Sequence, residues 1–151
     1  MRCAIIGGGP AGLMAAEALC ETGVAVRVYD AMPSLGRKFL LAGRGGLNLT
    51  HSEPLEKFLN RYSHPGAAAW VQAFGPEQIR QWARKLGVET FVGSSGRVFP
   101  TEMKAAPLLR SWVRRLRAGG VDFQPRWRWE GWTGQGQLRF STPEEIGRAH
   151  V

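Results

Sequence analysis

The sequence is short of cysteine, of acidic residues and of long apolar runs. It has two cysteines among 151 residues, and 12 Asp and Glu side chains against 20 Lys and Arg. No apolar run reaches the roughly 20 residues of a membrane helix. Glycines and Pro10 also interrupt the apolar stretch after Arg2 too early for a secretory signal. We therefore expect a globular cytoplasmic protein without a membrane segment, in which Cys3 and Cys20 stay reduced.

The signatures of common catalytic and metal sites are also missing. His51 and His64 have no second ligand at metal spacing, so we predict no metal site. Ser94 and Ser95 lack the strand-to-helix turn that exposes a nucleophilic serine. No residue stands out as a catalytic acid or base, and the catalytic residues stay unassigned.

The N-terminal region has the pattern of a βαβ unit that binds a dinucleotide. An apolar run at 3–6 predicts a buried strand, residues 11–22 predict a helix, and residues 24–29 predict a second strand. Residues 7–12 read Gly-Gly-Gly-Pro-Ala-Gly and contain the spacing G-x-G-x-x-G. This spacing, placed between a strand and a helix, is the dinucleotide-binding fingerprint.

The residues of this motif have distinct expected roles. Gly7 would make the tight turn out of the strand, Gly9 would let a pyrophosphate approach the backbone, and Gly12 would let the helix pack on the strand. Asp30 follows Gly12 by 18 residues, close to the ~20 of the fingerprint, and its carboxylate would accept hydrogen bonds from a ribose 2′-hydroxyl. The predicted contacts to the ADP half are Gly7, Gly9, Pro10, Ala11, Gly12 and Asp30.

The stretch after Asp30 bears on which dinucleotide binds. Residues 31–52 show no convincing regular element, and residues 36–50 are basic and rich in glycine. In nicotinamide dehydrogenases the second strand usually leads quickly into another helix of the sheet, so this long loop favours a different cofactor. Arg37 and Lys38 in the loop would neutralise phosphate charge. An NAD-dependent dehydrogenase is the alternative, and the loop would then be a surface connector.

Three blocks of the sequence resemble the YhiN/BaiN-type flavoproteins, which are FAD-dependent oxidoreductases. The blocks are residues 7–12, 36–50 and 93–100, within a similarity that runs over about residues 2–140. The resemblance implies FAD, a loop at 36–50 that lies toward the flavin, and hydride or electron transfer on an unknown organic substrate, with nicotinamide or another electron donor. It adds Gly45, Gly46 and Asn48 to the cofactor-binding set, which already contains Arg37 and Lys38.

Two departures from this family concern single residues. Many members have Arg-Cys-Asn where this chain has Gly46-Leu47-Asn48, so any role of a thiol there is absent. The acid after the second strand is more often Glu, and Asp30 is one methylene shorter.

The predicted fold class is α/β. We expect a truncated Rossmann-like FAD/NAD(P)-binding domain with a three-layer sandwich at residues 1–145, interrupted by inserted helices and a hairpin at about 51–100. Residues 146–151 match the translation of a widely used sequencing adapter and are expected to be a non-native tail. The other predicted elements are helices at 67–74, 76–86 and 106–118, a hairpin of 90–92 with 97–99, and strands at 121–123 and 137–140.

The basic charge allows a third function, nucleic-acid binding. The net charge is +8, and residues 104–128 hold seven basic side chains against the single Asp122. Residues 126–129 alternate arginine and tryptophan, which would suit base stacking. The alternation also predicts a strand with tryptophans on one face, and the arginines of 106–118 fit a solvated helix face. We therefore expect a small-molecule substrate and no nucleic-acid partner.

Overall fold

The computed structural model describes residues 1–64 and 66–143, so the predicted tail at 146–151 lies outside the described residues. The chain forms two compact units. The first contains Met1–Phe39 and the chain from Val113 onward, and the second is Leu40–Trp112. The predicted insertion at 51–100 falls within this second unit.

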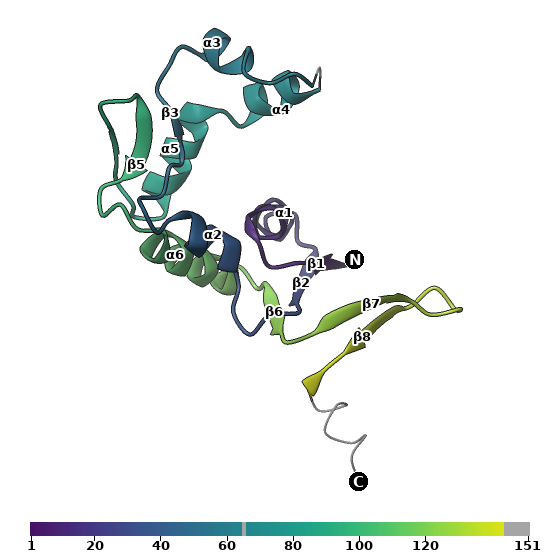
Figure 1. Cartoon of the computed structure of the whole chain (residues 1–151). Coiled ribbons are helices and arrows are strands. Elements are labelled where there is room, and N and C mark those ends of the chain that lie inside the picture. The colour runs from purple at the N-terminus through teal and green to yellow at the C-terminus, as the bar shows by residue number, and fades with distance from the viewer. Residues whose placement is uncertain (65, 144–151) are drawn as a thin grey trace. The chain divides into compact units, whose positions relative to one another are not determined.

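The first unit is built on a parallel sheet. Its strands are β1 (Arg2–Ile6), β2 (Ala25–Asp30) and β6 (Asp122–Pro125), in the order β1-β2-β6, and both pairings are parallel. Helix α1 (Pro10–Cys20) connects β1 to β2 and lies beside them in Figure 1. An order with the second strand in the centre is that of a dinucleotide-binding half-sheet. The predicted Rossmann-like α/β fold is confirmed.

Alternation along β2 explains how this sheet is covered. Val26 and Val28 are buried, as are Leu13 and Ala16 of α1, so one face of the sheet and the apolar stripe of the helix form a core. Tyr29 alternates with Val28 and therefore points to the opposite face.

A hairpin covers that opposite face near the end of β2. It consists of β7 (Arg128–Trp132) and β8 (Leu138–Ser141), which pair antiparallel. The ring of Phe140 stacks on Tyr29 with centroids 4.2 Å apart, and Trp127 lies 5.5 Å from the same ring. Helix, sheet and hairpin therefore form three layers here, as the sequence predicted.

The second unit has its own small sheet and helices. Its core includes Ala83, Leu86, Val98 and Leu108. The ring of Trp112 packs edge-on against that of Trp82, with centroids 4.7 Å apart. The strands are β3 (Thr50–His51), β4 (Thr90–Val92) and β5 (Arg97–Pro100), in the antiparallel order β3-β5-β4. The helices are α3 (Leu55–Leu59), α4 (Ala67–Ala73) and α5 (Pro76–Lys85).

Helix α6 (Ala105–Ala118) contains the division between the units and follows the predicted pattern. Its buried side chains include Leu108, Leu109, Trp112 and Leu116. Its exposed side chains include Arg110, Arg114 and Arg117. The predicted apolar stripe and solvated basic face are therefore confirmed.

Two local predictions are wrong. Residues 31–52 contain a short helix, α2 (Arg37–Ala42), as well as β3. Six helical residues between glycines are too few to show a 3.6-residue period. The alternation of arginine and tryptophan predicted a strand from Arg126, but Arg126 has φ +66° and makes a turn, so β7 begins only at Arg128.

Candidate dinucleotide site

The glycine turn lies where β1 ends and α1 begins. Gly7 has φ +107°, a conformation that side chains disfavour, and its N–H donates to the carbonyl oxygen of Tyr29 at 2.7 Å. The turn is therefore tied to the carboxyl end of the neighbouring strand β2. Ligands of open α/β sheets bind at this end of the strands.

The two other motif glycines have different environments. A Cβ added at Gly12 would collide with the carbonyl oxygen of Gly7 and lie 3.3 Å from Cγ2 of Ile5, so close packing of helix on strand excludes a side chain. A Cβ added at Gly9 would meet no atom within 4 Å, and the backbone there is extended, with φ −81° and ψ −178°. Nothing in the packing of residues 1–64 and 66–143 requires glycine at this position. Open space beside the backbone is what a bound pyrophosphate needs.

The start of α1 is suited to an anion. Gly9 caps the helix without a side-chain hydrogen bond, Pro10 occupies its first turn, and that turn contains no acidic residue. No acidic side chain of the helix's own first turn therefore neutralises the partial positive charge of this 11-residue helix. Together with the space beside Gly9, this arrangement fits the phosphates of a dinucleotide.

Asp30 lies against the glycine turn, and both of its carboxylate oxygens accept hydrogen bonds from the backbone. Oδ2 accepts from the N–H of Gly8 at 2.7 Å, and Oδ1 accepts from the N–H of Met32 at 2.8 Å. The sequence predicts Asp30 as a ribose ligand. It does not predict these two hydrogen bonds from the backbone N–H groups of Gly8 and Met32. Each carboxylate oxygen has a second lone pair with which it can accept a hydroxyl.

Gly8 is the residue that the sequence reasoning missed. Its carbonyl oxygen accepts from the N–H of Gly36 at 2.8 Å. A Cβ added at Gly8 would collide with Cδ2 of Leu35 and lie 3.0 Å from Oδ2 of Asp30. The available signal was a run of three glycines where the fingerprint requires only the first and third.

The remaining residues of the predicted set are divided between the two units. Arg37 and Lys38 are exposed and directly follow Gly36, whose N–H is bound to the glycine turn. Gly45, Gly46 and Asn48 belong to the second unit. In that unit Gly46 has φ +113°, and a Cβ there would approach Met103 Cε at 2.6 Å, while Asn48 is exposed.

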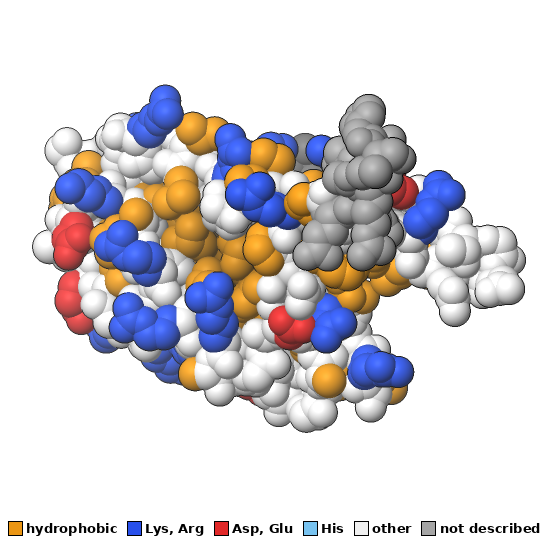
Figure 2. All heavy atoms as spheres, turned by 90° about the horizontal axis from the view of Figure 1, so that it is seen from below, with side chains coloured by type: hydrophobic (Ala, Val, Ile, Leu, Met, Phe, Trp, Pro, Cys, Tyr) orange, Lys and Arg blue, Asp and Glu red, His pale blue; other side chains and the backbone are white. Residues whose placement is uncertain are grey.

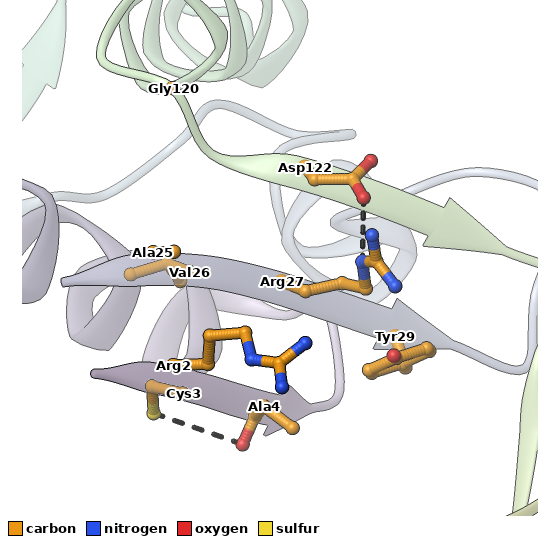
Figure 3. Close-up of a pocket in the computed structure, with 9 residues that line it drawn as sticks. All are labelled: Arg2, Cys3, Ala4, Ala25, Val26, Arg27, Tyr29, Gly120 and Asp122. Carbon is orange, nitrogen blue, oxygen red and sulfur yellow. Dashed lines mark hydrogen bonds and ion pairs between the residues drawn. The ribbon is translucent and has the colours of Figure 1, made fainter.

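A pocket of about 320 Å³ lies on the face of the parallel sheet away from α1 (Figure 3). Arg27 and Asp122 form an ion pair across it, with Nε 2.6 Å from Oδ2. The pKa of Arg27 is raised above its usual value, mainly by a hydrogen bond with Tyr29 and next by the hydrogen bond with Asp122. The pair links β2 to β6.

Other kinds of site have little support in the described part of the chain. Within residues 1–64 and 66–143 no three His, Cys, Asp or Glu side chains come together as a metal site, and no helix is long and apolar enough to cross a membrane. In the face shown in Figure 2, Lys and Arg side chains are spread out with apolar side chains between them.

Comparison with known families gives one match over almost the whole chain. Residues 1–150 match the model described as the HI0933-like protein Rossmann domain. The match includes the glycine turn and both units of the structure.

Several solved structures have a similar fold at low identity. THI4 of Thermovibrio ammonificans is 19% identical, with TM-score 0.55, and the match covers 98% of this chain and 50% of that one. A 3-ketosteroid-delta4-(5alpha)-dehydrogenase of Rhodococcus jostii RHA1 is 16% identical, with TM-score 0.63, over 93% and 41% of the two chains. OxyS anhydrotetracycline hydroxylase of Streptomyces rimosus is 18% identical, with TM-score 0.50, and the match covers 95% of this chain and 29% of that one. This chain therefore spans half or less of the length of these structures, and the likeness concerns the fold.

Proposed function

This chain belongs to the HI0933-like Rossmann-domain family of FAD-dependent oxidoreductases, and we propose that its first unit binds the ADP half of FAD. FAD is the cofactor of the family. The flavin supplies the hydride or electron chemistry when it is bound. The contribution of this chain is to bind and orient the cofactor.

The environment of Gly9 is the observation that carries this proposal. Its open surroundings and the uncapped start of α1 let phosphate oxygens reach backbone N–H groups. Asp30 lies beside the same turn and is free to accept ribose hydroxyls with its remaining lone pairs. Arg37 and Lys38 follow the turn that is bound to Gly8 and would neutralise phosphate charge.

The finer assignment rests on the sequence resemblance. We propose an oxidoreductase of the YhiN/BaiN type, in which Gly45, Gly46 and Asn48 lie toward the flavin half. Its substrate would be a small organic molecule, and a nicotinamide or another electron donor would reduce the flavin. We propose a cytoplasmic enzyme, in which Cys3 and Cys20, which form no disulfide in the structure, would stay reduced.

Release of the cofactor by acid tests the proposal. The purified protein, reconstituted with FAD, should be yellow, and acid precipitation should leave the flavin in the supernatant, because nothing in the sequence marks a covalent tether. A Gly9→Val variant, treated in the same way, is the matched control and should stay colourless. A wild-type protein that stays colourless with FAD, or a yellow acid pellet, would contradict non-covalent FAD binding.

A further inference from the structure

The side chain of Asp30 joins two separate pieces of backbone. One oxygen accepts from Gly8 in the glycine turn, and the other accepts from Met32 in the turn that follows β2. Bonds of this kind between a carboxylate and backbone N–H groups are among the strong hydrogen bonds of proteins. The carboxylate therefore holds the glycine turn and the turn at 31–36 in one arrangement.

Several further contacts fix both ends of this connection. Gly8 also accepts the N–H of Gly36 at 2.8 Å. On the other side, the carbonyl oxygens of Asp30 and Met32 accept from the N–H groups of Trp127 at 3.0 Å and Arg126 at 3.1 Å. The backbone that carries the carboxylate is thus held by the segment after β6, and the carboxylate in turn holds Gly8.

We propose that Asp30 is a positioning residue that holds the glycine turn in the form that receives the pyrophosphate. This inference rests on the proposed function. A run of three glycines has more backbone freedom than any other tripeptide, and ordering it only on binding would lower affinity. A carboxylate that orders the turn beforehand raises the affinity for the phosphates, whether or not the ligand has ribose hydroxyls.

Two ligands separate this role from direct contact with the ribose. ADP and 2′,3′-dideoxy-ADP share the pyrophosphate, and only ADP has ribose hydroxyls. The affinity of each is measured by calorimetry for the purified apo-protein and for Asp30→Asn. Asparagine keeps the size of the side chain and can still bond to a hydroxyl, but its amide group places a donor against one of the two backbone N–H groups. Asp122→Asn is the matched control, because its acid lies in the same sheet and pairs with Arg27.

The two roles lead to different results. If Asp30 positions the turn, Asp30→Asn weakens both ligands by a similar factor, about ten- to a hundredfold, and Asp122→Asn weakens neither. If Asp30 acts only through the ribose, the dideoxy ligand binds the variant as tightly as the wild type, and the proposal is overturned. The proposal is also overturned if Asp30→Asn melts at a lower temperature but, while still folded, binds ADP and 2′,3′-dideoxy-ADP as tightly as the wild type. Asp30 would then stabilise the fold without positioning the turn for phosphate.

Amide hydrogen exchange tests the same contact without any cofactor. In the apo-protein the N–H groups of Gly8 and Met32 should be protected, and Asp30→Asn should increase the exchange rate of at least one of them, while Asp122→Asn should not. Unchanged exchange at both amides would contradict the positioning role. Failure of the wild-type protein to bind ADP or FAD would instead refute the proposed function, and the exchange measurement would still decide whether Asp30 orders the turn.

Discussion

Replacement of Gly9 by alanine should separate cofactor binding from folding. A Cβ at this position meets no atom within 4 Å, and the extended backbone suits any residue. Gly9→Ala should therefore keep the free energy of unfolding, or raise it by about 0.4–1 kcal/mol, because alanine restricts the unfolded chain. The methyl group would still occupy the space beside the backbone. Loss of one hydrogen bond to a phosphate, at about 1.5–3 kcal/mol, would weaken FAD by roughly ten- to a hundredfold, and the larger Gly9→Val should abolish binding.

Gly12→Ala should have the opposite profile. Its Cβ would be forced against the carbonyl oxygen of Gly7 inside the protein. Overpacking of this kind costs about 1–3 kcal/mol of the free energy of unfolding. We expect Gly12→Ala to melt at a lower temperature in the absence of any cofactor, whereas Gly9→Ala does not.

Thermal unfolding without cofactor and titration with FAD, followed by flavin fluorescence, measure the two effects separately. Gly134→Ala is the matched control, because a Cβ there also meets no atom within 4 Å and the residue lies in the β7–β8 connection. If Gly9→Ala bound FAD as tightly as the wild type, the space beside Gly9 would not be the phosphate site, and if it melted as early as Gly12→Ala, glycine at position 9 would be required for folding.

Further predictions concern α6 and the second unit. Arg114→Ala, on the exposed face, should change the free energy of unfolding by less than about 0.5 kcal/mol and leave FAD binding unchanged. Arg115→Ala breaks a partly buried ion pair with Glu17 of α1 and should lower the free energy of unfolding by about 1–3 kcal/mol in urea titration; equal stability of the two variants would contradict this. Gly96→Ala should destabilise the protein by about 1–3 kcal/mol, because Gly96 has φ +78° and its Cβ would lie 2.7 Å from the ring of His51. An unchanged melting temperature would show that this turn adapts.

The glycine turn could be predicted from the sequence because its requirements are local. A strand, a helix and fixed spacing between them already determine that Gly7 must turn and that Gly12 must let the helix pack. The contacts of Gly8 could not be predicted in this way. They depend on the turn at 31–36, which has no periodic pattern and is positioned by backbone bonds to Arg126 and Trp127, nearly a hundred residues later in the chain.

The same physical distinction explains the errors outside the site. The stripe of α6 was predicted correctly because 14 residues give almost four turns of periodic burial. Helix α2 has six residues, and its sequence shows no such period. At Arg126 the local alternation favoured a strand, but the bond from its N–H to Met32 and its φ of +66° belong to a turn that joins two layers of the fold. Tertiary contacts decided the conformation there.

The elements of the proposed ADP site are complete within the first unit. The glycine turn, Asp30 and Gly36 come from the first part of the chain, and the backbone that fixes Asp30 comes from the segment directly after β6. The second unit is inserted between these two parts. None of the contacts described for Gly8 or Asp30 involves the second unit, so we expect substitutions confined to that unit to leave these hydrogen bonds in place.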